Sequence, residues 1–158
     1  MTVQLIHVGE FKENHYAAAA AEYVRRLGAF CDFIDTPVKE TKISDERSAA
    51  EVSKALESEG VRILAAVKQR SYPVALCIEG RQMDSGSFAA LLEKRRADPG
   101  SVSFIIGSSH GLSESVKRSC GLLLSMSVMT FPHSLARVML LEQIYRGFMI
   151  TRGAPYHK

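Results

Sequence analysis

Short apolar segments alternate along this chain with longer segments that have helical character. The apolar segments have the length of β-strands and cover residues 3–8, 30–38, 74–78, 102–106 and 122–128. The segments between them have the spacing or composition of α-helices and cover residues 16–27, 44–59, 61–68, 85–97, 112–120 and 132–151. The pattern therefore predicts strands and helices in alternation.

Single residues at the ends of these segments mark the predicted boundaries. Gly28 is expected to stop the first helix, because glycine is a poor helix former. Ser44 is expected to cap the second helix, and Gly60 to break it before a short further helix. Pro132 suits the first turn of the last helix, which ends before Gly153.

Alternation of this kind predicts an α/β domain with a mostly parallel sheet and helices on both faces. With 158 residues and no linker, repeat or low-complexity segment, we expect residues 1–158 to form a single domain. The apolar runs at 74–78 and 102–106 predict strands that are buried on both faces. Ligands of such sheets bind beyond the carboxyl ends of the strands, so the loops after residues 78, 106 and 128 are the expected binding region.

Composition narrows the class of protein. Hydrophobic residues make up 46% of the chain and charged residues 23%, as in ordinary globular domains. We find neither a basic, apolar leader nor an apolar stretch long enough for a bilayer, so we expect a cytoplasmic protein without membrane contact. Three isolated cysteines, Cys31, Cys77 and Cys120, indicate reduced thiols. No CxxC or HxxxH spacing occurs, so no metal site is expected.

The C-terminal residues 133–158 carry the excess positive charge. They contain four basic residues and one acid, Glu142, and their sum of +3 equals the net charge of the whole chain. Frayed termini are usually polar and featureless, whereas this one carries Pro155, Tyr156 and His157. Tyrosine can stack on a nucleobase, and basic side chains can hold phosphate. The segment therefore favours an anionic partner such as RNA, with a merely frayed tail as the alternative.

The predicted last helix is apolar on more than one side, which favours burial against a partner subunit as well as against the core. His133 lies in its first turn, and Arg137 follows four residues later on the same face. Glu142 and Arg146 have the spacing of an ion pair. Either these polar residues only face solvent, or the helix contributes one side to an active site.

Gly80, Gly107 and Gly111 each follow a predicted strand. Bare backbone at these positions permits close approach of a ligand, although ordinary turns are the more common explanation. Neither GxGxxG nor GxxxxGK[ST] occurs, which disfavours a dinucleotide-binding, P-loop or flavodoxin-like nucleotide-binding domain. We interpret His110 as a solvent-exposed loop residue rather than a catalytic one.

Six segments, in this order, resemble one protein family. They are residues 76–80 (LCIEG), 104–107 (FIIG), 111–113 (GLS), 129–133 (MTFPH), 141–146 (LEQIYR) and 155–158 (PYHK). Over essentially the whole chain the sequence is similar to the ribosomal RNA large subunit methyltransferase H family, a branch of the SPOUT methyltransferases. The resemblance implies a C-terminal deep trefoil knot, a homodimer and S-adenosylmethionine as cofactor. It also implies methylation of N3 of a pseudouridine in 23S ribosomal RNA, within the assembled ribosome.

Carried over by position, the resemblance also assigns site residues. The cofactor would lie against Leu76, Gly107, Met126, Ser127, Val128, Met129, Thr130 and Phe131. Backbone groups would pair with the adenine edge, and apolar side chains would cover the faces of the ring. His157 would accept the N3 proton, with Tyr156 and Arg152 positioning the acceptor base. This tail could reach the cofactor of the partner subunit.

One departure from the family pattern occurs in the loop after residue 106. Family members usually have two consecutive glycines there, whereas Gly107 is followed by Ser108, Ser109 and His110. Ser108 fits only if its φ is negative. A function of another class, a non-catalytic RNA- or ribosome-binding module on the same fold, would keep the basic tail but lack affinity for the cofactor.

Overall fold

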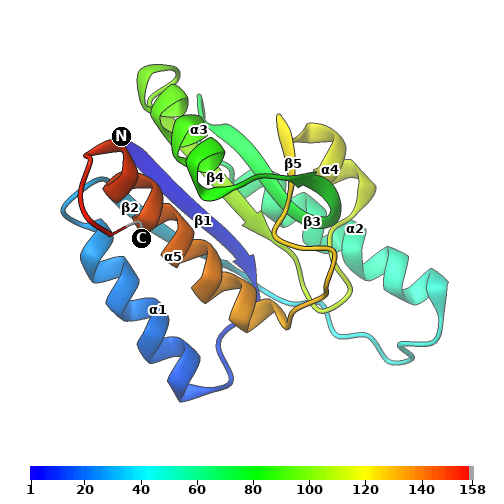
Figure 1. Ribbon diagram of the computed structural model, residues 1–158. Helices are drawn as coiled ribbons and strands as arrows, with labels where there is room; N and C mark the ends of the chain where they lie inside the picture. The colour runs from blue at the N-terminus through cyan, green and yellow to red at the C-terminus, as the bar shows by residue number, and fades with distance from the viewer. Residues whose placement is uncertain (157–158) are drawn as a thin grey trace.

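Five parallel strands form one sheet in the order β2-β1-β4-β3-β5 (Figure 1). The computed structural model describes residues 1–156 of the chain. The strands are β1 (Thr2–Val8), β2 (Asp32–Val38), β3 (Tyr72–Gln82), β4 (Ser101–Ile106) and β5 (Leu122–Ser125). The helices are α1 (Asn14–Leu27), α2 (Ala49–Ala66), α3 (Ser85–Ala97), α4 (Glu114–Ser119) and α5 (His133–Thr151). The predicted α/β class is confirmed.

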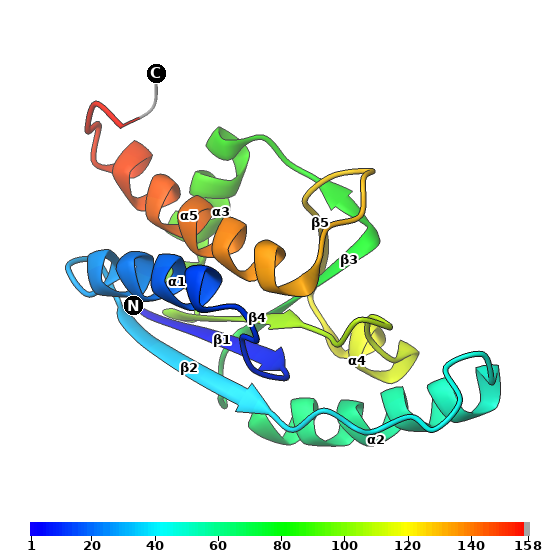
Figure 2. The same ribbon diagram turned by 90° about the horizontal axis from the view of Figure 1, so that it is seen from below.

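Helices cover both faces of the sheet, as the sequence predicts. α1, α3 and α5 lie on one face, and α2 and α4 lie on the other (Figure 2). The side chains of β1 alternate accordingly, because successive residues of a strand point to opposite faces. Val3 and Leu5 pack in the core beneath α1, α3 and α5, whereas Ile6 and Val8 pack beneath α2 and α4. β4 lies at the centre of the sheet and is buried along its whole length.

α2 is one continuous helix, although the sequence predicts a break at Gly60. Its N-cap is Ser48, whose side chain accepts from the backbone N–H of Glu51, while the predicted cap Ser44 donates to the Glu51 carboxylate. Gly60 lies where α2 packs on α4, and a Cβ at this position would come within 2.5 Å of Ser113 Oγ. Glycine is therefore present for close helix packing, and not as a helix breaker.

β3 separates from β4 in its second half and continues along β5. It pairs with β4 only as far as Ala75, and its pairing with β5 shifts register between Leu76 and Arg81. The residues between these two positions therefore bulge out of the ladder. Ile78 is 59% exposed, so the prediction that 74–78 is buried on both faces is wrong for the end of this segment.

β5 ends at Ser125, earlier than predicted. Ser125 Oγ donates to the carbonyl of Ser127 at 2.9 Å, and Ser127 Oγ accepts from the N–H of Met129 at 3.0 Å. Such local bonds satisfy the backbone without a strand ladder and so favour a turn. Gly80 of β3 packs directly on β5, where a Cβ would lie 2.6 Å from the carbonyl carbon of Leu124.

α5 packs between two neighbouring helices, α1 and α3 (Figure 1). At the α3 contact a Cβ on Gly147 would lie 2.7 Å from Leu92 Cδ1, so the two helices approach closely. Towards the end of α1, Tyr145 packs edge-on against Phe30 with ring centroids 5.7 Å apart. α1 and α3 thus cover part of the apolar surface of α5, while Met139 lines a further hollow of about 700 Å³ beside the start of α3. The partner subunit that the sequence predicts from this broad apolar surface stays a prediction.

Candidate functional site

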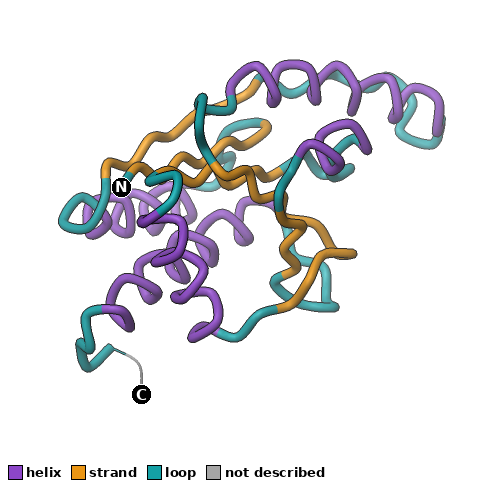
Figure 3. Tube along the Cα trace, turned by 90° about the horizontal axis from the view of Figure 1, so that it is seen from above, coloured by secondary structure: helices purple, strands orange, loops and turns teal. Residues whose placement is uncertain are grey.

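A cavity of about 330 Å³ opens at the carboxyl ends of β3, β4 and β5. It is lined by residues 76–79, by residues 106–112 and, apart from Val128, by residues 124–131; His133 of α5 also contributes. Figure 3 distinguishes the loops from the strands that they follow. Residues 106–112 and 124–131 contain the loops after β4 and β5 in which the sequence predicts binding. Residues 76–79 lie instead within β3, at its bulge, because this strand continues to Gln82.

The loop after β4 is a tight turn closed by its own backbone. The N–H of Gly111 donates to the carbonyl of Ser108 at 3.0 Å, and Gly111 has a φ of +91°. A Cβ on Gly107 would lie 1.9 Å from the carbonyl oxygen of Gly111. The turn itself therefore requires glycine at position 107, whether or not a ligand passes beside it. Ser108 has no positive φ, so it meets the condition set by the sequence.

All but one of the predicted cofactor residues line the cavity. Those in the lining are Leu76, Gly107, Met126, Ser127, Met129, Thr130 and Phe131. Val128 is 82% exposed and lies outside the lining. Apolar side chains and main-chain polar groups together are typical of sites for flat heterocyclic ligands.

An ion pair that the sequence does not predict stands at the cavity. Lys117 of α4 pairs with Glu79 of β3 and, at 2.9 Å, with Glu114; both Lys117 and Glu79 are part of the lining. The hydrogen bond from Lys117 lowers the pKa of Glu79. The hydrogen bonds to Glu79 and Glu114 raise the pKa of Lys117. The pair is therefore charged at neutral pH. No motif marks Lys117, because only the fold brings α4 beside β3.

Cys77 is the thiol of the cavity. Burial, reinforced by the charge of Glu79, raises its pKa, so this thiol stays protonated at neutral pH and is a poor nucleophile. Burial also raises the pKa of Cys31 and of Cys120 to about 11. All three cysteines are free, in agreement with the prediction of reduced thiols.

His133 and Arg137, which the sequence places on one face of α5, have different surroundings. His133 lines the cavity. Arg137 is 3% exposed, its Nη2 lies 2.9 Å from His7 Nε2, and its guanidinium stacks 3.7 Å from the ring of Phe11. His7 is held from its other side as well, because its Nδ1 lies 2.7 Å from the carbonyl of Gly9 and donates to it. Arg137 thus ties α5 to β1 and is not part of the cavity lining.

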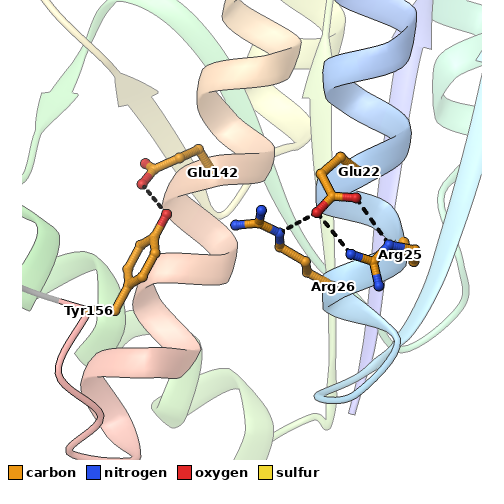
Figure 4. A network of polar contacts seen from close by, with 5 residues as sticks. All are labelled: Glu22, Arg25, Arg26, Glu142 and Tyr156. Carbon is orange, nitrogen blue, oxygen red and sulfur yellow. Dashed lines mark hydrogen bonds and ion pairs between the residues drawn. The ribbon is translucent and has the colours of Figure 1, made fainter.

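The C-terminal tail folds back onto the middle of α5. Tyr156 packs edge-on against Tyr145 at 5.1 Å and lies beneath the guanidinium of Arg146 at 4.8 Å. Its hydroxyl donates to Glu142 at 3.4 Å (Figure 4). Glu142 also accepts from Arg146 at 2.6 Å, which confirms the pair predicted from their spacing.

The tail begins at the end of α5 opposite to the cavity (Figure 2). Its Tyr156 reaches back to Glu142, which at about 1.5 Å per residue lies roughly 14 Å along the helix from His133. Neither Tyr156 nor Arg152 belongs to the cavity lining. His157, the predicted base, lies outside the described residues.

Two absences concern residues 1–156. No group of three or more histidine, cysteine or carboxylate side chains in this range could hold a metal ion. None of the helices there is long and apolar enough to cross a membrane.

The whole sequence matches known proteins. A family model described as "Predicted SPOUT methyltransferase" matches residues 1–157. A Streptococcus thermophilus (strain CNRZ 1066) protein named Ribosomal RNA large subunit methyltransferase H is 47% identical over 159 residues, which cover 100% of both chains.

Solved structures share the fold at low sequence identity. A probable methylase family protein from Haemophilus influenzae Rd KW20 is 16% identical with a TM-score of 0.58, over 99% of this chain and 70% of that one. A Legionella pneumophila structure, described as a methyltransferase in complex with the bound cofactor S-adenosylmethionine, is 16% identical with a TM-score of 0.52. This match covers 96% of this chain and 66% of that one.

Proposed function

Because this chain belongs to the SPOUT methyltransferase family, we propose that it methylates N3 of a pseudouridine in 23S ribosomal RNA. The family predicted from the sequence is confirmed, and S-adenosylmethionine is the cofactor. Similarity over the full length to a protein named for the large ribosomal subunit supports ribosomal RNA as the acceptor. The acceptor atom follows from the family resemblance. A ribosomal substrate would require the protein to act in the cytoplasm.

The cavity at the ends of β3, β4 and β5 is the observation that carries this proposal. Its volume of about 330 Å³ lies within the usual range for ligand sites, roughly 300–1,000 Å³. The closed turn at 107–111 contributes Gly107 and Gly111 to the lining, and Leu76, Met129 and Phe131 add apolar surface. We infer that these residues hold the adenosine part of the cofactor. The knot implied by the family resemblance stays a prediction.

The bound cofactor supplies an electrophilic methyl group, so the protein must position the acceptor nitrogen and remove its proton. We infer that His157 accepts the N3 proton, while Tyr156 and Arg152 orient the base. Since Tyr156 is held on the middle of α5 and neither Tyr156 nor Arg152 lines the cavity of its own chain, we infer that these residues serve the cavity of a second subunit. The site would then be complete only in a homodimer.

Exposed apolar side chains near the cavity support such a dimer. Ile78, Val128 and Met129 are 59%, 82% and 68% exposed, and Ile78 and Met129 belong to the cavity lining. Exposed apolar clusters of this kind are typical of interaction surfaces. A partner packed on these three residues would lie at the entrance of the cavity, where its tail is needed.

Mass spectrometry of ribosomal RNA from cells with and without the gene would test the proposed function. We expect loss of one methyl group from a pseudouridine of 23S ribosomal RNA, and its return on complementation. Titration calorimetry with S-adenosylmethionine tests the alternative in parallel. An unchanged methylation pattern, together with no cofactor binding, would leave a non-catalytic RNA- or ribosome-binding module.

The choice of substrate and base can be tested with the purified protein. Methyl transfer to assembled ribosomes should exceed transfer to free ribosomal RNA, because a small net charge gives few phosphate contacts. His157→Ala should lower kcat about a hundred- to ten-thousand-fold and flatten the pH–rate profile if this residue is the base. An unchanged pH–rate profile in His157→Ala would show that another group is the base.

A further inference from the structure

A second hollow adjoins the cofactor cavity and has no part in the function proposed so far. Its volume is about 820 Å³, and it lies beyond the carboxyl ends of β1, β2 and β4. Ser108, Ser109 and His110 line both hollows. A ligand in the second hollow would therefore contact the same turn as a ligand in the cofactor cavity.

The outer wall of this hollow is the segment 39–46, between β2 and α2. α2 fixes the segment in place: the backbone N–H of Thr41 donates at 2.8 Å to Glu59, a carboxylate that is 2% exposed. Arg62 donates to the carbonyl of Lys39 at 3.0 Å and to the hydroxyl of Thr41 at 2.5 Å. These hydrogen bonds therefore fix the position of the outer wall of the hollow.

The lining offers groups of both charges. Its charged side chains are Lys12, Lys39, Lys42, Glu10, Glu40 and Glu46. Within the described part of the chain, none of the three lysines forms an ion pair with a carboxylate, so their ammonium groups are available to a ligand. A nucleotide needs such a mixture, because its phosphates require cations and its base and ribose carry both donors and acceptors. A bare phosphate would gain nothing from the glutamates.

We propose that this hollow receives the acceptor nucleotide of the RNA. Its base lies on the turn at 108–110, beside the cofactor cavity, and its flanking phosphates lie on Lys39 and Lys42. The proposal rests on the proposed function, methyl transfer to RNA. The volume suits a nucleotide, because ligand sites of roughly 300–1,000 Å³ are usual.

Charge reversals in the wall test this proposal. Lys39→Glu and Lys42→Glu change side chains that line the second hollow but not the cofactor cavity. Each should raise the KM for ribosomes from cells lacking the gene about ten-fold or more, and should reduce the salt dependence of log KM by about one phosphate contact. Affinity for S-adenosylmethionine, measured by calorimetry, should stay at the wild-type value. Lys94→Glu on α3, which lines neither hollow, is the matched control and should leave KM and its salt dependence unchanged.

The outcomes separate this proposal from the proposed function. If the wild-type protein methylates ribosomes and both reversals keep the KM and salt dependence of the control, the hollow is not the RNA site and the enzyme assignment stands. If the wild-type protein methylates no RNA, the proposed function fails first. Uridine 5′-monophosphate, titrated into the protein with S-adenosylhomocysteine and followed by NMR, then tests the hollow directly. Amide shifts confined to the segments that line the hollow, residues 9–12, 37–46 and 108–110, support the site, and shifts elsewhere or no shifts overturn it.

Discussion

Gly107 and Gly111 belong to the turn between the two hollows, and each position requires glycine for a different reason. In Gly107→Ala the new Cβ would lie 1.9 Å from a backbone oxygen, so the main chain must move. We expect a loss of about 1–3 kcal/mol in unfolding free energy, together with weaker cofactor binding. Gly111→Ala meets no atom within 4 Å but keeps its φ of +91°, which costs about 1–2 kcal/mol. Urea unfolding and calorimetry measure both effects.

This clash changes how position 107 can be used. The sequence suggests that a larger residue there would block the cofactor while the fold stays native. The contact with Gly111 shows that any side chain also disturbs the turn. Wild-type stability in Gly107→Ala would contradict that geometry. Thr130, which is exposed and lines the cavity, is a better position at which to block the cofactor.

Asp35 provides a pH-dependent contribution to stability. Its side chain lies 3.2 Å from His7 Nε2. Burial acts to raise the pKa of Asp35, but the hydrogen bond with His7 and the charges of His7 and Arg137 outweigh burial and lower it. A lowered carboxyl pKa stabilises the fold above the unfolded value of about 3.9, and the effect is lost as pH falls through the folded value.

Asp35→Asn should therefore have a lower Tm than the wild type at pH 7, and the gap should close in acid. The reason is that both proteins are neutral at this position once the wild-type carboxylate is protonated. Thermal unfolding between pH 7 and pH 2 measures the gap, with Asp45→Asn, an exposed carboxylate elsewhere, as the control. A gap of the same size at both ends of this range would show that charge is not the cause.

At the contact between α2 and α4, helix propensity favours alanine at position 60, whereas the close packing of the two helices favours glycine. Alanine at position 60 would improve helix propensity by about 0.5–1 kcal/mol, but its Cβ would meet Ser113 Oγ at 2.5 Å. We expect Gly60→Ala to destabilise the protein by about 1–3 kcal/mol. In a Ser113→Gly background the clash is relieved, so the same change should cost less. Urea unfolding of the double-mutant cycle should give a coupling of about 0.5–3 kcal/mol, and additive costs would contradict the contact.

Helices and strands that are determined by local sequence features could be predicted from the sequence. The last helix was expected at 132–151 and occupies His133–Thr151, because its apolar spacing and its opening proline are local features. The bulge after Leu76 could not be predicted, since it depends on β4 ending beside Ala75 while β3 continues along β5. Gly60 was misinterpreted for a similar reason: its partner Ser113 is remote in the sequence.

At the scale of the whole molecule, the cavity and the C-terminal tail of the proposed site differ in how far the sequence predicts their positions. The cavity lining could be predicted, because the carboxyl ends of parallel strands meet at one edge of the sheet. The burial of Arg137 against His7 and Phe11 and the pairing of Lys117 with Glu79 could not, since each joins distant segments. The position of the tail follows from the packing of Tyr156 on Tyr145 and Glu142, in the middle of α5 and outside the cavity lining. We therefore propose that a second subunit brings a tail and a cavity together.

A mixture of two inactive variants tests whether the site is shared between subunits. Truncation after Gly153 removes the tail, and Thr130→Trp fills the cavity. The truncated protein should keep its cofactor affinity and lose about 0.5–1.5 kcal/mol of stability with the contact between Tyr156 and Tyr145. Alone, each variant should transfer no methyl groups, although both should sediment at twice 17.4 kDa. Co-expressed, they should recover about a quarter of wild-type activity, because half of the dimers would carry one intact site. If the tail served its own chain, every heterodimer would hold two broken sites and the mixture would stay inactive. If the tail took no part in the reaction, the truncated protein alone would be fully active.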